Sequence, residues 1–433
     1  MNYALILAFD ERNYSLNSFP NCFSPLLGKS MITYLIDELK RIDIQPICIA
    51  SSLEEVSLFN SEYAYEKNQF FLSIENIIKE DGVTLFIPSY KPLVDHTIIR
   101  ETIDYHSFNG NEVTIVSTEE KIKNKQANKD KSKIHKCKSL DDSIYLINNK
   151  VLKKIFSQKE NLKFPFNLEN LIKRIKGKIG FMSIRKTYKF ANIVNAYQLS
   201  KIEDILRNEI NRNHMVNGVY IENSKTITIG PDVCLEPKSI IRSGSIILGN
   251  SLIKSNAVIG PNSEISNSYI GENAIVAHSV VVDSSVGKGA MVGPFTHLRM
   301  HTSVGDYDRI GNFVEIKNST IGEKTNISHL TYVGDTECGK GVNFGCGVVT
   351  VNYNGVSKFK TTIGNNVFIG CNSNLIAPIK IKNGAFIAAG STITEDLEEN
   401  DFSIARMKQI TKSGYAKKYG YKKYFEEDES LSS

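Results

Sequence analysis

Residues 229–265 read IGPDVCLEPKSIIRSGSIILGNSLIKSNAVIGPNSEI, and an aliphatic residue stands at every sixth position of this stretch. The same spacing returns over 286–316 and over 363–393, with glycine and small polar residues between the aliphatic ones. A period of six fits neither a helix of 3.6 residues per turn nor the two-residue alternation of a strand. Hexapeptide repeats of this kind build a parallel β-helix. The pattern therefore predicts a coil with three six-residue sides, in which residues eighteen apart are stacked about 4.8 Å apart.

The composition is that of an ordinary globular chain of 433 residues, 41% hydrophobic and 23% charged, long enough for two or three domains. No apolar run is long enough to span a bilayer. The seven cysteines are scattered without a CxxC pair, so we expect a cytoplasmic protein without disulfides or a metal site. The net charge is only +5, and the lysine-rich run 121–138 has no interleaved aromatic residues. That run is read as a solvated loop rather than a nucleic-acid site.

Strand-like and helix-like segments alternate before the repeats begin. Strands are predicted at 3–9, 45–50, 83–88, 112–117 and 143–148, and helices at 30–42, 74–80 and 96–105. This alternation predicts an α/β domain with a mainly parallel sheet. We expect this domain over 1–195, an amphipathic connecting helix over 196–217, the β-helix over 218–395 and a tail over 396–433, disordered beyond Tyr419.

Two cations stand eighteen residues apart in the repeat region. Arg299 and Lys317 each follow an aliphatic residue of the six-residue series, so both are predicted to point outward and to stack. Stacked cations repel unless an anion lies between them, which favours a phosphate site over the alternative of solvated surface charges. His329 follows one coil later in SHLTYVGD and is a candidate base, although a lone histidine is more often structural.

Four motifs resemble a known enzyme family. They are GNFVEIKNSTIGEKTNISHLTYVGD (311–335), VNFGCGVVTVNYNG (342–355), KTTIGNNVFIGCNSNLIAPI (360–379) and IAAGSTIT (387–394). They are similar to the bifunctional N-acetylglucosamine-1-phosphate uridyltransferase/glucosamine-1-phosphate acetyltransferase family, without a gap from 293 to 406. The resemblance implies a left-handed β-helix that forms a homotrimer with acetyl-transfer sites between subunits. It also implies acetyl-CoA as acyl donor and an amino-sugar phosphate as acceptor, with no nucleic-acid partner.

The resemblance assigns roles to individual residues of the repeat region. His329 takes the position of the general base. Residues that hold the sugar and its phosphate are Arg299, Lys317, Tyr332, Asn343 and Lys358. Residues that contact the acetyl group and coenzyme A are Cys346, Asn352, Tyr353, Cys371, Ala389 and Arg406. Some family members have alanine and serine where Cys346 and Cys371 stand. Reactive cysteines are an alternative that no neighbouring base or metal motif supports.

The first domain departs from the same family at its nucleotide site. The family's glycine-rich LAAGxGTRM loop reads LAFDERNYS here, with Asp10 and Arg12 for two glycines and Tyr14 for an arginine. The family lysine falls at Asn21, and its two metal ligands fall at Tyr90 and Ala196. Because nucleotidyl transfer needs metal and cationic charge, we expect a nucleotidyltransferase-like fold without Mg²⁺ or uridyl transfer.

The leading hypothesis is therefore acetyl-CoA-dependent N-acetylation of glucosamine 1-phosphate, a step toward UDP-N-acetylglucosamine for the cell wall. Three alternatives remain. The chain is a full bifunctional enzyme that also uses UTP, a non-catalytic trimeric scaffold, or an acetyltransferase with another acceptor.

Overall fold

The computed structural model describes residues 2–8, 21–50, 64–66, 76–118, 143–157, 177–185 and 187–416, with single positions at 56, 57, 59, 69, 73, 74, 172 and 175. The expectations for Asp10, Arg12 and Tyr14, for the lysine-rich run and for the end of the tail lie outside the described residues. Contacts divide the chain into two units, 1–234 with 246–251, and 235–245 with 252–433. Each is described by itself.

A seven-stranded sheet forms the centre of the first unit. Its order is β5-β4-β1-β6-β8-β7-β9, and all neighbours are parallel except β8, which is antiparallel to β6 and β7. The prediction of a mainly parallel sheet is confirmed. The strands are β1 (Tyr3–Leu7), β4 (Gln45–Ala50), β5 (Ala64–Glu66), β6 (Val83–Pro88), β7 (Val113–Thr118), β8 (Ile144–Asn148) and β9 (Ile179–Ile184). A separate antiparallel pair joins β2 (Pro25–Leu26) to β3 (Lys29–Ser30).

Both faces of this sheet are buried. Along β1, Leu5 packs in one hydrophobic cluster and Ile6 in another, because successive side chains point to opposite faces. This explains the continuous apolar run of the strand. The helices of this unit include α1 (Met31–Lys40), α4 (His96–Phe108), α6 (Asn149–Phe156) and α8 (Ala196–Val216). No described helix is long and apolar enough to cross a membrane.

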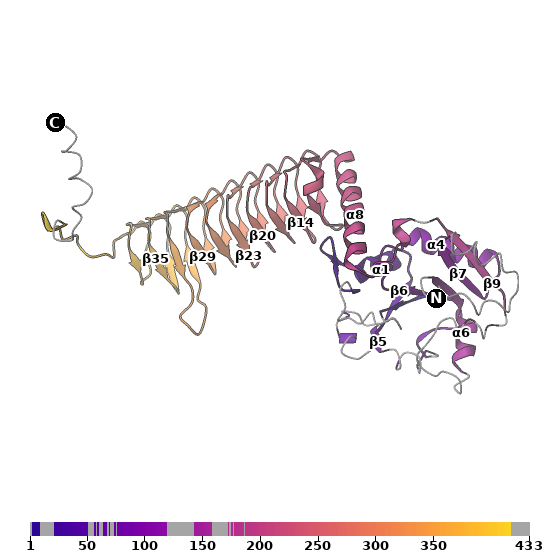
Figure 1. Cartoon of the computed structure of the whole chain (residues 1–433). Helices are drawn as coiled ribbons and strands as arrows, with labels where there is room; N and C mark the ends of the chain where they lie inside the picture. The colour runs from indigo at the N-terminus through magenta and orange to yellow at the C-terminus, as the bar shows by residue number, and fades with distance from the viewer. Residues whose placement is uncertain are drawn as a thin grey trace. The chain divides into compact units, whose positions relative to one another are not determined.

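Short parallel strands from Tyr220 onward form a left-handed β-helix with three sides. We number the sides in chain order: side 1 runs from β10 (Tyr220–Ile221) to β39 (Phe402–Ser403), side 2 from β11 (Thr228–Ile229) to β38 (Thr392–Ile393), and side 3 from β12 (Cys234–Leu235) to β36 (Ile379–Ile381). Figure 1 shows the coils in a row at β20 (Val280–Val282), β23 (His297–Arg299), β29 (Tyr332–Gly334) and β35 (Asn374–Ile376).

The six-residue series supplies the interior of the coil. Ile241, Ile310 and Ile369 are each 0% exposed, and the remaining members of the series are buried as well. Each strand places one such residue inward and its neighbours outward, which is why the period of six appears in the sequence. The predicted β-helix and its aliphatic core are confirmed.

The prediction of a uniform spacing of eighteen residues per coil is wrong. Ile240 pairs with Val258, eighteen residues on, but Val258 pairs with Ile275 and Ile275 with Met291, seventeen and sixteen residues on. Some sides contain five residues, as between the buried Ile265 and Ile270, where Asn267 turns the corner in the left-handed conformation with φ 47°. Sequence distance therefore gives the stacking of residues only to within one or two positions.

Candidate active site

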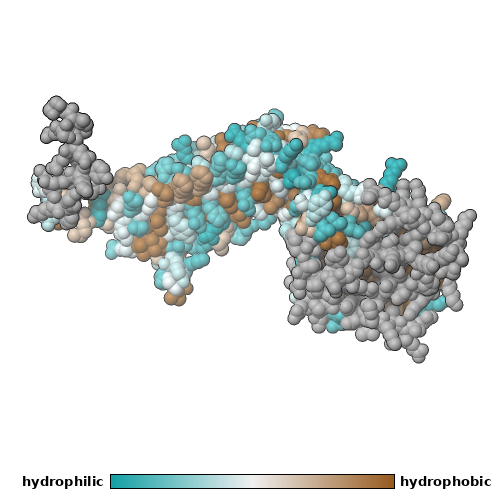
Figure 2. Space-filling view, in the orientation of Figure 1, coloured by the Kyte–Doolittle hydropathy of each residue, from teal (hydrophilic) through white to brown (hydrophobic). Residues whose placement is uncertain are grey.

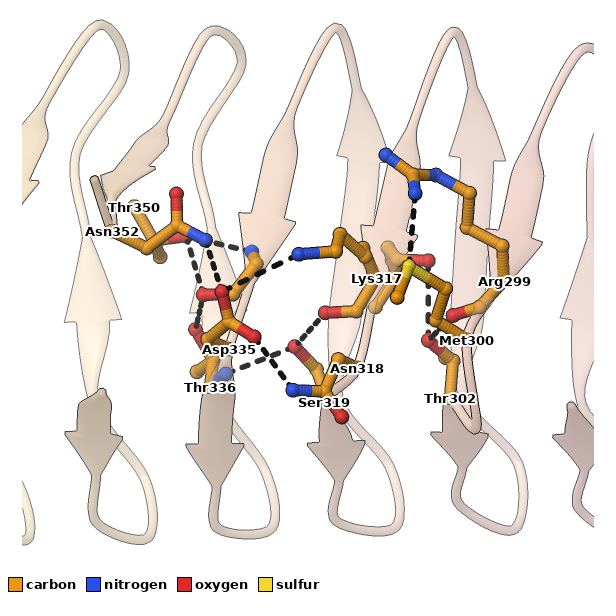
Figure 3. Close-up of polar contacts among 12 residues, drawn as sticks. Arg299, Met300, Thr302, Lys317, Asn318, Ser319, Asp335, Thr336, Thr350 and Asn352 are labelled. Carbon is orange, nitrogen blue, oxygen red and sulfur yellow. Dashed lines mark hydrogen bonds and ion pairs between the residues drawn. The ribbon is translucent and has the colours of Figure 1, made fainter. Parts of the chain in front are cut away.

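The two predicted cations stack on side 2 of the β-helix. Arg299 ends β23 and Lys317 ends β26 (Glu315–Lys317), and the two residues are partners in parallel register. The residues before them, Leu298 and Ile316, are 0% exposed, so the cations point outward (Figure 3). The predicted stacking is confirmed.

Each of these cations has a carboxylate partner within the chain. Arg299 Nε and Nη2 lie 2.8 and 2.7 Å from Glu315 Oε1. The Lys317 side chain is only 7% exposed, and its Nζ lies 3.6 Å from Asp335 Oδ2. Because these carboxylates offset part of the repulsion between the cations, stacking alone does not require a bound anion. A phosphate site at this stack therefore requires a further cation.

Lys358 supplies that further cation from an inserted loop. Phe359 N donates to Asn352 O at 2.8 Å, and Tyr353 pairs with Lys358 in an antiparallel bridge, so the segment folds back as a hairpin. Figure 1 shows a loop projecting from the row of coils between β29 and β35. Contact with the Lys317 side chain, and then its charge, lowers the pKa of Lys358 from its ordinary value. Three cations and two carboxylates leave one excess positive charge, which suits a phosphate.

His329 has the hydrogen-bond geometry of a base. It is the last residue of β28 (Asn326–His329), is exposed, and its Nδ1 lies 3.0 Å from Asn312 Oδ1. An amide oxygen only accepts hydrogen bonds, so Nδ1 is the donor, and in the neutral ring the lone pair is then on Nε2. Sequence reasoning missed Asn312, which pairs with His329 from seventeen residues earlier. A spacing of eighteen points to Gly311 instead.

Four of the predicted residues form a column at the corner between sides 1 and 2, one in each successive coil: His329, Cys346, Cys371 and Ala389. The carbonyl oxygens of the first three accept backbone N–H groups from the next coil at 3.4, 2.8 and 2.7 Å. Arg406 Nη1 donates to the carbonyl oxygen of Ala389, so the guanidinium group lies at the end of the column. The structure therefore groups these coenzyme A candidates in line with His329.

The cations and the column lie at opposite ends of the same short strand. β29 runs from the corner of His329 to the corner of Lys317, and three residues span about 10 Å. A Cβ at Gly334 would lie 2.5 Å from the Tyr332 hydroxyl and 2.7 Å from Asn352 Nδ2, so glycine leaves room for both side chains. Asn343 is set apart from the cations, on the outer face of side 1 in β31 (Asn343–Phe344).

The positions expected to hold nucleotide and metal in the first unit contain no carboxylate. Asn21 Oδ1 accepts a backbone hydrogen bond at 2.9 Å, the Tyr90 carbonyl accepts one at 2.8 Å, and Ala196 opens α8. The adjacent Lys91 is 2% exposed, and its Nζ donates to the carbonyl oxygen of Phe190 at 3.0 Å. Over the described part of the chain, no three His, Cys, Asp or Glu residues are grouped so that they could hold a metal ion.

Comparisons with known proteins give one matching repeat family and a set of similar solved structures. The family described as Bacterial transferase hexapeptide (six repeats) matches residues 360–395. Similar solved structures are the UDP-N-acetylglucosamine acyltransferases of Francisella novicida (17% identity, TM-score 0.25, 41% of this chain and 63% of that chain) and Campylobacter jejuni (16%, 0.24, 43% and 70%).

Two relatives match along almost their whole length. The chain is 39% identical over 450 residues to the bifunctional protein GlmU of Acholeplasma laidlawii, covering 96% of this chain and 97% of the relative. It is 34% identical over 457 residues to the bifunctional protein GlmU of Clostridium novyi, covering 97% and 99%. On this full-length similarity, together with its hexapeptide β-helix, the chain belongs to the GlmU family.

Proposed function

We propose that the β-helix transfers the acetyl group of acetyl-CoA to the amine of glucosamine 1-phosphate, giving N-acetylglucosamine 1-phosphate for UDP-N-acetylglucosamine synthesis. One observation carries the proposal. Lys317, with Lys358 in contact with it, and His329 lie near opposite ends of β29, whose three residues span about 10 Å of backbone. An acceptor with a phosphate at one end and an amine at the other fits between them.

The reaction follows from these groups. The amine nitrogen attacks the thioester carbonyl carbon, so a C–N bond forms as the C–S bond breaks. His329 Nε2 takes the proton released by the amine and returns it to the departing coenzyme A thiolate. In this proposal Lys317, Lys358 and Arg299 hold the phosphate, and the Tyr332 hydroxyl binds a sugar hydroxyl, as the family resemblance assigns it.

The acyl donor is assigned to the column below His329. Coenzyme A would lie along Cys346, Cys371 and Ala389, with Arg406 near its phosphates. The family resemblance assigns Asn352 and Tyr353 to the acetyl end and Asn343 to the sugar. Every described cysteine is free, which fits the reducing cytoplasm that we propose as the setting.

We propose further that three copies assemble, with the sites between them. The outer face of side 1, which carries Asn343, also exposes the large apolar side chains of Ile275, Met291, Phe368 and Phe386. Figure 2 shows hydrophobic patches between hydrophilic ones on one face of the β-helix. Burial of such residues favours association. Light scattering should give three times the 48.4 kDa chain mass, and a monomer that acetylates at full rate would contradict the assignment.

Uridyl transfer is proposed to be absent from this chain, although its relatives are named bifunctional. Tyr90 and Ala196 supply no carboxylate where the resemblance expects Mg²⁺, and Asn21 supplies no charge where it expects a lysine. The bifunctional enzyme is the second candidate, favoured by those names. A non-catalytic scaffold is the third.

Two assays on the same purified preparation distinguish these functions. Release of the coenzyme A thiol is measured with acetyl-CoA and glucosamine 1-phosphate, and pyrophosphate release with UTP, Mg²⁺ and N-acetylglucosamine 1-phosphate. We expect the first activity and not the second. Pyrophosphate release at a comparable rate supports the bifunctional enzyme, while thiol release only with another amino sugar changes the acceptor. If neither activity is detected, the non-catalytic scaffold is the remaining candidate.

A further inference from the structure

Asp335 lies at a corner of the coil that does not itself require an acid. It follows β29 directly and has the left-handed conformation, φ 50°. Asn318 holds the same corner one coil earlier with φ 47°, and Asp335 N donates to the carbonyl oxygen of Lys317 at 3.0 Å. Asparagine tolerates this conformation at least as well as aspartate. The negative charge at 335 therefore needs an explanation other than the turn.

The Asp335 carboxylate joins groups from three successive coils. Oδ1 accepts a hydrogen bond from Asn318 Nδ2 at 2.6 Å, while Oδ2 accepts one from Asn352 Nδ2 and lies 3.6 Å from Lys317 Nζ (Figure 3). Burial acts to raise the pKa of Asp335, but these hydrogen bonds and the charges of Lys317 and Lys358 outweigh it and hold the pKa below its ordinary value. The group is ionised at neutral pH.

An ionised carboxylate fixes the orientation of the amide that it contacts. Because Asp335 can only accept, Asn352 must present its NH₂ group to it, and the Asn352 oxygen then points away from Asp335 (Figure 3). Asn352 is 7% exposed, so its amide has little freedom to turn. The same NH₂ group lies near the Tyr332 hydroxyl, since a Cβ at Gly334 would be 2.7 Å from Asn352 Nδ2 and 2.5 Å from that hydroxyl.

The same carboxylate favours the charged form of Lys358. The Lys317 side chain is almost buried and close enough to Lys358 to lower the pKa of Lys358, while the charges of Asp335 and Tyr332 act to raise it. Without the Asp335 charge, the Lys358 ammonium group would lose its proton at lower pH, because the repulsion from Lys317 would be opposed less. Phosphate binding would then weaken as the pH rises.

Resting on the proposed acetyl transfer, we propose that Asp335 is a positioning residue that ties Lys317, on the phosphate side of the site, to Asn352, on its acyl side. The carboxylate holds both partners before substrate arrives, so that the acceptor phosphate and the acyl group are placed relative to each other. It touches neither substrate.

Asp335→Asn is the test, because it keeps the size and the corner conformation, removes the charge and turns one of the two acceptor oxygens into an NH₂ group. Asn318→Gly is the matched control, since glycine also accepts the left-handed corner and the change removes the other hydrogen bond of the carboxylate. In the thiol-release assay we expect Asp335→Asn to lower kcat/KM for glucosamine 1-phosphate about 10–100-fold. KM should rise, kcat should fall, and the alkaline limb of the pH profile should move to lower pH. The control should stay within about threefold of the unaltered chain.

A second measurement is independent of turnover. Trace labelling with an amine-reactive anhydride over a pH series gives the titration of Lys358 by peptide mass spectrometry. We expect Lys358 to titrate at lower pH in Asp335→Asn. Unchanged titration of Lys358, or unchanged kcat and KM over the whole pH range, overturns the proposal. If the unaltered chain does not acetylate glucosamine 1-phosphate, the proposed function fails, and the labelling still decides whether Asp335 controls Lys358.

Discussion

Compared with the unaltered chain, the variant Asp308→Asn should gain more thermal stability at pH 8 than at pH 5. Asp308 is 1% exposed, and its position in the coil is occupied by Ala290 one coil earlier and Thr325 one coil later. Its two carboxylate oxygens accept backbone N–H groups of Gly305 and Thr325 at 2.7 and 2.8 Å. A carboxylate at this position is buried without a cation among the partners described.

The magnitude follows from the shifted titration. Burial raises the pKa of Asp308 from 3.8 to about 7, with Asp306 and Glu323 acting in the same direction. The folded chain therefore binds the proton more tightly than the unfolded chain, so stability falls as the pH rises from about 4 to 7. At about 1.36 kcal/mol per pKa unit, the full penalty is on the order of 4 kcal/mol. Between pH 5 and pH 8 it grows by roughly 2–3 kcal/mol.

Asparagine stays neutral and escapes this pH-dependent penalty. It loses one hydrogen bond, because its NH₂ group faces one of the two N–H donors, at a cost of about 1 kcal/mol that does not change with pH. The difference in melting temperature between variant and unaltered chain should therefore shift by about 5–10 °C in favour of Asp308→Asn from pH 5 to pH 8.

Calorimetry or circular dichroism at the two pH values provides the assay. Asp283→Asn is the control, because Asp283 is an exposed carboxylate at a corner of the β-helix and is not among the groups that shift the pKa of Asp308. An equal melting-temperature difference at pH 5 and pH 8 for Asp308→Asn would show that the carboxyl titrates normally, and the reasoning from burial would be refuted.

Three further predictions concern the site. His329→Asn should lower kcat for thiol release by about 10²–10⁴ with little change in KM, and unchanged kcat would remove histidine as the base. Lys317→Met should raise KM for glucosamine 1-phosphate about 10–100-fold through loss of a charged contact, and a saturation curve that does not move would contradict the phosphate assignment. Iodoacetamide should alkylate exposed Cys371 unless acetyl-CoA is present, as measured by peptide mass spectrometry, and lack of protection would place coenzyme A elsewhere. Buried Cys338 is the control, since burial raises its pKa and it should remain unmodified throughout.

The aliphatic core could be predicted because each coil repeats one physical requirement. Ile241 and Ile369 are fully buried at positions that the six-residue period marks, and local side length sets that period. The pairing of Asn312 with His329 could not be predicted, because one side of the coil between them is a residue shorter than six. The error of one residue is harmless for the core, but it decides which side chain meets the histidine.

The charge balance of the site also could not be predicted from the six-residue pattern. Stacking of Arg299 over Lys317 follows from a spacing of eighteen, and the structure confirms it. The approach of Lys358 to Lys317 depends instead on how the hairpin 352–359 folds back, which has no counterpart in the repeat. Likewise, the contact between Asp335 and Asn352 joins the hairpin to a coil corner seventeen residues earlier.

The carboxylate partners show why the inserted loop matters. Arg299 and Lys317 each take a carboxylate from the next coil, Glu315 and Asp335, so two cations are matched by two anions. A regular coil repeats its charges about every 4.8 Å, and an unmatched column of cations would be strained by its own repulsion. The stack is therefore balanced, and a balanced stack has little affinity for phosphate. Lys358 adds the unmatched charge from outside the repeat. The insertion that interrupts the six-residue period thus adds a positive charge to a neutral ladder, as the phosphate site that we propose requires.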